Sequence, residues 1–97
     1  GNNAYIFPGI GLGVYASSAR LITQSMFLSA ARVLSDLVTD TEISRGSVYP
    51  SLRRVRTVSK AIAVSVCGVA AREGLIEEKL PDQLEDYIES LMYNPIY

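Results

Sequence analysis

The chain has 97 residues, a formal net charge of −1 and 48% hydrophobic side chains, so it can form one compact unit with a modest core. Its near-neutral charge gives no general attraction to nucleic acid, and no run approaches the roughly 18 apolar residues that would span a bilayer. The chain has no histidine, which excludes a complete histidine-dependent triad, and a single cysteine, which excludes an internal disulfide.

The first predicted elements are short and rich in small residues. Residues 4–7 form an apolar run too brief for a helix and predict a buried strand. Residues 10–19 predict a helix with two interior glycines. Since each glycine costs a helix about 0.5–1 kcal/mol relative to alanine, they indicate close packing against a neighbouring element. Thr23 is a favourable N-cap for the next predicted helix, residues 24–38, whose apolar positions form a helical stripe.

The second half of the chain is predicted to be helical. A capping-box pattern at residues 39–42 starts a short turn or helix, and a loop follows. Apolar residues spaced by three and four then predict one long helix over residues 50–73, ended by Gly74. After a linker, a last helix opens at Pro81 and is stopped by Pro95.

The predicted fold class is mostly α, with one short strand and four or five helices. A single strand has no partner within the chain, so its expected position is the edge of a larger sheet. The chain also begins with glycine inside a motif. We therefore expect it to be a fragment of a longer protein that contains the rest of this sheet.

Two adjacent amides, Asn2 and Asn3, are the first candidate site, because they stand at the mouth of the predicted strand. An asparagine side chain offers an acceptor and two donor hydrogens on a short stem, so it can orient a carboxylate or a carboxamide without adding charge. The alternative is a pair of turn amides that hydrogen-bond to their own backbone.

Residues 11–16 match the G-x-G-x-x-A pattern of dinucleotide-binding turns, and they follow a predicted strand and lead into a predicted helix. Such sites need an acidic residue about twenty positions further on to hold the ribose. The first later acid is Asp36, which lies in a predicted helix rather than at a strand end. Close helix packing is therefore the favoured interpretation, and a pyrophosphate site is the less favoured alternative.

The chain is polarised in charge despite its near-neutral total. Residues 73–97 carry seven acids and one lysine, whereas a preceding stretch is basic and contains no acid among its cations Arg45, Arg53, Arg54, Arg56 and Lys60. This stretch predicts either a contact with a phosphate or another anion, or a solvated helix face that pairs in part with the acidic tail, and the second is favoured.

Two further residue types are interpreted as structural. Cys67 lies in an apolar run and is expected to be a small buried hydrophobe rather than a catalytic thiol. The later tyrosines are expected to pack or to form interfaces rather than to act as catalytic acids; they are Tyr49, Tyr87, Tyr93 and Tyr97.

The sequence resembles the late part of the NAD(P)-dependent malic enzymes. The most specific match is the GNNAYIFPG block of residues 1–9, and the resemblance weakens between about Glu73 and Glu89. Further matching segments are residues 11–14, 20–23, 26–28, 30–31, 46–50, 55–61 and 91–93.

This resemblance implies that residues 1–74 end a Rossmann-like α/β NAD(P)-binding domain and that residues 75–97 form a C-terminal helical tail. It implies oxidative decarboxylation of L-malate to pyruvate and CO₂ with reduction of NAD or NADP. Asn2 would bind the substrate, and Asn3 would be a cofactor contact or an orienting neighbour. The catalytic base and acid, the Mg²⁺ or Mn²⁺ ligands and the phosphate loop belong to upstream parts of such enzymes, so the fragment alone is expected to be inactive.

The implied partners are L-malate, the remainder of the enzyme chain and further copies in a homo-oligomer, without nucleic acid or membrane. The sequence leaves open whether the cofactor is NAD or NADP. It also leaves open whether the compartment is the cytoplasm or the mitochondrial matrix. The alternative from a different class is a small α-helical interaction module without catalysis, which the amphipathic helices, the absent histidine and the polarised charge support.

Overall fold

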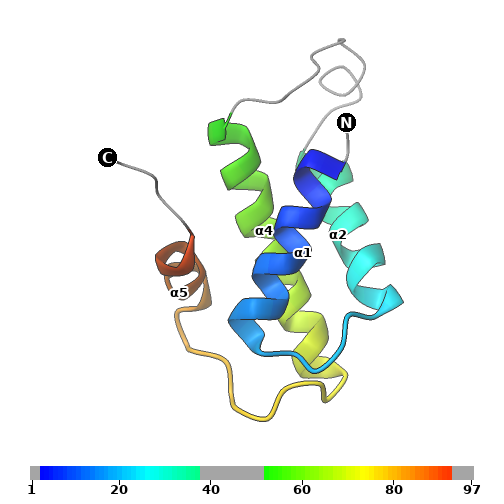
Figure 1. Cartoon of the computed structure of the whole chain (residues 1–97), viewed down its shortest axis with the longest axis vertical. Helices are drawn as coiled ribbons and strands as arrows, with labels where there is room; N and C mark the ends of the chain where they lie inside the picture. The colour runs from blue at the N-terminus through cyan, green and yellow to red at the C-terminus, as the bar shows by residue number, and fades with distance from the viewer. Residues whose placement is uncertain (1–2, 38–51, 93–97) are drawn as a thin grey trace.

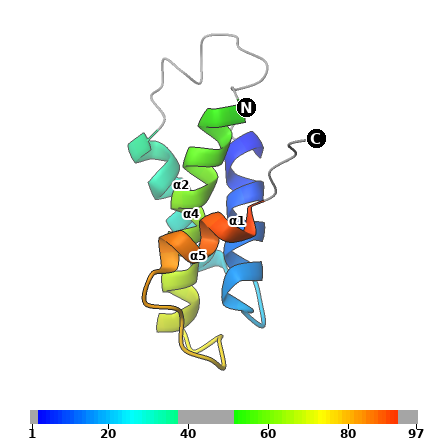
Figure 2. The ribbon, with the colours of Figure 1, turned by 90° about the vertical axis from the view of Figure 1, so that its left-hand side faces the viewer.

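The computed structural model describes residues 3–37 and 52–92, and these ranges form four helices (Figure 1). In chain order they are α1 (Asn3–Ser17), α2 (Gln24–Leu37), α4 (Leu52–Arg72) and α5 (Leu84–Leu91). Helices α1, α2 and α4 lie side by side, and α5 runs across α1 and α4 (Figure 2). Helices α1 and α4 each contact all of the other three helices, so together they form the centre of the unit.

Helix α4 confirms the long helix predicted from the apolar spacing, with its ends at Leu52 and Arg72. It ends in a Schellman motif around Gly74, whose φ of 68° favours glycine. The Leu75 N–H donates to the Ala70 carbonyl at 2.9 Å, and the Gly74 N–H donates to the Ala71 carbonyl at 3.3 Å. Four of the buried apolar side chains of α4 lie at the predicted positions, namely Val58, Ile62, Val66 and Val69.

Helix α2 confirms the predicted N-cap. The Met26 N–H donates to the Thr23 Oγ1 at 3.4 Å, so α2 begins directly after Thr23. Met26, Ala30 and Leu34 are buried against α1 and α4. The neighbouring Phe27 lies at the solvent edge of this stripe, with 40% of its surface exposed.

The predicted strand at residues 4–7 is wrong, because these residues belong to the first turns of α1. A helix pairs its backbone groups within itself, whereas a strand needs a neighbouring strand, and none is present within residues 3–37 and 52–92. Pro8 lies inside α1 and removes only one backbone hydrogen bond near its beginning. The regular secondary structure of the described residues is therefore entirely helical, and α1 includes both the predicted strand and most of the predicted helix.

Glycines bring α1 and α4 together. A Cβ placed on Gly13 would lie 2.7 Å from the Val66 Cβ, and one on Gly9 would lie 2.6 Å from the Ile62 Cβ. The two glycines are one turn apart, and so are their partners on α4. Gly11, in contrast, is exposed and meets nothing within 4 Å. The predicted close packing is thus confirmed at Gly13 but not at Gly11. The second glycine in contact with α4 is Gly9.

Helix α5 docks through the apolar face predicted for the last helix, although it begins at Leu84 rather than near Pro81. Ile88 is completely buried in a cluster with Ala16, Ala63 and Cys67. Leu84 and Leu91 are partly buried beside this cluster, and Tyr87 is 38% exposed. The predicted features at residues 39–42, 44–49 and 95 lie outside the described residues.

None of the helices in the described ranges combines the length and the apolar character that crossing a bilayer would need.

Candidate functional site

The two amides singled out in the sequence are not placed as a site. Asn2 lies outside the described residues, and Asn3 is defined only as the first residue of α1. The interpretation of Asn2 as a substrate ligand and Asn3 as a cofactor contact therefore stays a prediction.

The G-x-G-x-x-A residues lie entirely inside α1. A phosphate site needs backbone N–H groups that are free at the beginning of a helix, whereas in mid-helix these groups are used by the helix itself. The Gly13 carbonyl accepts hydrogen bonds from the Ser17 Oγ at 2.8 Å and from the Cys67 Sγ at 3.4 Å. These residues do not fit a dinucleotide pyrophosphate, in agreement with the sequence interpretation.

The donors that would hold a divalent metal are likewise not gathered in the described part of the chain. Within residues 3–37 and 52–92 no three side chains of histidine, cysteine, aspartate or glutamate come together as a possible metal site. The metal ligands that the resemblance implies are therefore not found among these residues.

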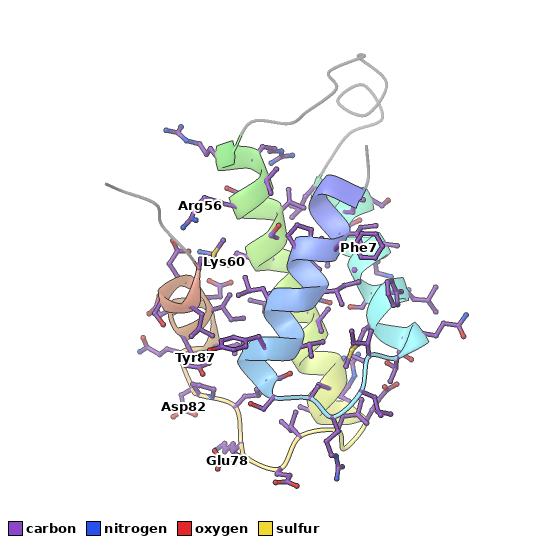
Figure 3. All side chains as sticks on the ribbon, in the orientation of Figure 1. Phe7, Arg56, Lys60, Glu78, Asp82 and Tyr87 are labelled. Carbon is purple, nitrogen blue, oxygen red and sulfur yellow. The ribbon has the colours of Figure 1, made fainter. Side chains whose placement is uncertain are left out.

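Helices α4 and α5 enclose a basic cleft of about 470 Å³. Three of its six lining residues are cationic, and the full lining consists of Arg53, Arg56, Thr57, Lys60, Glu89 and Met92. The three cations are spaced by three and four residues along α4, which places them on one face of the helix. Figure 3 shows Arg56 and Lys60 leaving α4 on the side where α5 lies.

The Lys60 Nζ lies 3.1 Å from the Glu89 Oε2, so this part of the basic face pairs with the acidic tail as the favoured sequence interpretation expected. Both side chains are partly exposed, and such a pair contributes less than about 1 kcal/mol to stability. Arg54 has a different role, because its guanidinium donates to the Leu37 carbonyl at the end of α2. Arg45 lies outside the described residues.

A smaller apolar hollow of about 200 Å³ adjoins the basic cleft and shares Arg56 and Met92 with it. Its other lining residues are Pro8, Leu12, Val55, Ser59 and Leu91. Ser59 is 3% exposed, and its hydroxyl has no hydrogen-bond partner. Sequence reasoning found the cations of the cleft but missed Ser59, because nothing in a sequence marks a buried hydroxyl that lacks a partner.

Cys67 is buried, as the sequence predicted, and burial raises the pKa of its thiol, with a hydrogen bond to Ser17 offsetting part of the effect. The folded state thus holds the thiol proton more tightly than the unfolded chain does. The protonated thiol therefore contributes stability that is fully present below the pKa of Cys67 in the unfolded chain. This stability is lost as the pH rises through the higher pKa of Cys67 in the folded protein.

We expect Cys67 in the folded protein to react with iodoacetamide at pH 8 at least about tenfold more slowly than in urea, because the thiolate is both disfavoured and covered. Mass spectrometry of timed samples measures both rates. Equal rates would show that the thiol is accessible and would contradict the buried position.

The structure thus defines a helical unit centred on α1 and α4, with a basic cleft between α4 and α5 and an apolar hollow among α1, α4 and α5. The family described as "malic enzyme, NAD binding domain" matches residues 1–71. The chain belongs to this family.

Curated relatives match the chain along its whole length. The mitochondrial NAD-dependent malic enzyme of Amaranthus hypochondriacus is 44% identical over 108 residues, which cover 100% of this chain and 17% of that protein. The NADP-dependent malic enzyme of Dictyostelium discoideum is 40% identical over 97 residues, or 100% of this chain and 18% of that protein. The NADP-dependent malic enzyme of Rattus norvegicus is 40% identical over 98 residues, which cover 100% of this chain and 17% of that protein. The chain thus spans about a sixth of the length of these relatives.

Proposed function

We propose that the chain is the late portion of an NAD(P)-dependent malic enzyme, which converts L-malate to pyruvate and CO₂ while reducing NAD or NADP. The observation that supports this proposal is the family match over residues 1–71, which includes the paired amides, together with relatives named as NAD- or NADP-dependent malic enzymes. In this proposal residues 1–74 end the cofactor domain and residues 75–97 form a C-terminal tail.

The role proposed for this chain is positioning. Asn2 would hold a malate carboxylate so that the C2 hydrogen faces the nicotinamide, which lowers the barrier by orientation rather than by proton transfer. Asn3 opens α1, and α1 packs on α4 through Gly9 and Gly13. This packing would give the amides a rigid base, and the chain would form one wall of the pocket.

We expect Asn2→Ala in the intact enzyme to raise the KM for malate by about tenfold or more, because one hydrogen bond to a charged group is worth about 1.5–3 kcal/mol. Asn3→Ala should act instead on the KM for the dinucleotide. Asn94→Ala is a matched control, since it makes the same change outside the motif. Initial-rate kinetics with each substrate varied in turn measure the three effects, and an unchanged malate KM in Asn2→Ala would remove Asn2 from the site.

A non-catalytic interaction module is the second candidate, and exposed apolar side chains on the α1–α2 side favour it. Phe7 is 56% exposed and stacks edge-on against Phe27, with ring centroids 6.4 Å apart, and Leu28 is 65% exposed. The same surface fits contact with the remainder of an enzyme. Mixing the chain with a malic enzyme truncated before the GNN motif separates the two functions, because only an enzyme portion should restore malate-dependent reduction of the dinucleotide.

A further inference from the structure

We propose that the basic cleft and the adjoining apolar hollow together bind a small amphiphilic anion, in which a phosphate or carboxylate head is joined to a compact apolar group. This site is built from residues of α1, α4 and α5, and it does not depend on the paired amides or on malate.

The basic cleft supplies the contacts for the anionic head. The lining of the cleft contains three cations, Arg53, Arg56 and Lys60. Its one acidic residue is Glu89. The first turn of α4 contains no acidic residue that would offset the positive end of the helix dipole. This dipole therefore adds to the positive electrostatic potential of the three cations. Arginine presents its donors in a planar fork that matches the oxygens of phosphate and carboxylate. An anion in the cleft would therefore replace Glu89 as the partner of Lys60.

The apolar hollow accommodates the body of the ligand. It is lined mainly by the aliphatic side chains of Leu12, Val55 and Leu91 and by the ring of Pro8. Its volume of about 200 Å³ is close to that of cavities known to take up a single benzene ring. Since the hollow shares Arg56 and Met92 with the cleft, a molecule whose head lies among the cations can extend its apolar group into the hollow.

Ser59 is an independent observation that points to the same ligand. A buried hydroxyl without a partner is disfavoured in a folded protein, and Ser59 lines the hollow with its oxygen unsatisfied. The hydroxyl oxygen is covered in this structure, so a polar atom of a bound molecule would give it its missing hydrogen bond after a small shift of the side chains beside the hollow. The cations, the apolar wall and the unsatisfied hydroxyl are three features that one amphiphilic anion would contact together.

Calorimetric titration of the intact protein tests the site with four probes: phenyl phosphate, benzoate, inorganic phosphate and benzyl alcohol. We expect phenyl phosphate or benzoate to bind at least tenfold more tightly than inorganic phosphate, which lacks the apolar group, and than benzyl alcohol, which lacks the charge. The stronger of the first two identifies the head. Equal binding of inorganic phosphate and phenyl phosphate would show that the hollow takes no part, and no heat from either aromatic anion would overturn the proposal.

Charge variants locate the binding. The double variant Arg53→Gln with Lys60→Gln should weaken binding of the aromatic anion by about tenfold or more. Arg72→Gln should leave it unchanged, because Arg72 is at the other end of α4, roughly 18 Å from Lys60 and roughly 28 Å from Arg53 at 1.5 Å per residue. Arg53→Lys should retain part of the affinity. If Arg72→Gln weakens binding as much as the double variant does, the attraction is a general charge effect and the cleft is not the site.

Ser59→Ala separates a binding role from a structural one. We expect it to weaken binding severalfold while leaving the thermal midpoint of the unliganded protein unchanged or higher, because it removes an unsatisfied hydroxyl. A lower midpoint with unchanged affinity would assign Ser59 to the fold and would remove it from the site.

Discussion

Replacing Gly13 by alanine is expected to destabilise the protein by about 2–3 kcal/mol, whereas the same substitution at Gly11 should stabilise it by about 0.5–1 kcal/mol. Both positions lie in the interior of α1, so alanine gains the same helix propensity at each. The difference comes from the surroundings. Gly13 is buried against α4, and Gly11 faces open space.

The clash at Gly13 cannot be relieved by rotating a side chain. The new Cβ would lie 2.7 Å from the Val66 Cβ and 3.0 Å from the Ala63 carbonyl oxygen, and both atoms are fixed by the backbone of α4. The helices would have to move apart, which would loosen the buried contacts of Ile62 and Val66 along the whole interface.

Urea denaturation followed by circular dichroism measures both free energies of unfolding, with Gly11→Ala as the control that carries only the propensity effect. Gly9→Ala should behave like Gly13→Ala, because its Cβ would lie 2.6 Å from the Ile62 Cβ. If Gly13→Ala were as stable as Gly11→Ala, α1 and α4 would not be in the close contact described.

The helices with strong local signals could be predicted from the sequence. Thr23 caps α2, the spacing of apolar residues defines α4, and Gly74 ends it in a left-handed conformation. Each of these signals acts between residues a few positions apart, so it can be recognised from the sequence alone. The buried face of α5 was predicted for the same reason, although its first residue was not.

Residues 4–7 could not be assigned from the sequence because four apolar residues are compatible with either a strand or a buried helix. The outcome depends on partners far along the chain. Gly9 and Gly13 meet Ile62 and Val66 only when α1 is helical, because helical spacing places the two glycines on one face. Among the residues described, no strand offers the competing backbone partner.

The candidate site was predictable only in outline. The basic residues of α4 are visible in the sequence, but the cleft exists because α5 crosses beside them, and this crossing depends on tertiary packing. The role of Asn2 and Asn3 was inferred from the malic enzyme resemblance, and it stays a prediction because Asn2 lies outside the described residues and Asn3 is placed only as the beginning of α1.

Ile88→Ala is expected to destabilise the docked state of α5 by about 2–4 kcal/mol, because it removes a completely buried side chain and leaves a cavity against Ala63 and Cys67. Helix α5 has 8 residues and is too short to be stable in water by itself, so its structure depends on docking. Helix α5 is also attached by the ion pair between Lys60 and Glu89, whose side chains are 34% and 55% exposed. Solvent screening limits such a pair to less than about 1 kcal/mol.

Glu89→Gln is therefore the matched comparison, since it alters the neighbouring residue of the same helix and removes only the ion pair. Amide hydrogen exchange of residues 84–91 measures how firmly α5 is docked. We expect protection to fall by at least about thirtyfold in Ile88→Ala, since 2 kcal/mol corresponds to about that factor, and by less than about sixfold in Glu89→Gln. Comparable losses in the two variants would show that charge rather than burial holds α5. Because α5 forms one wall of the basic cleft, Ile88→Ala should also weaken binding of the aromatic anion, although Ile88 does not line the cleft.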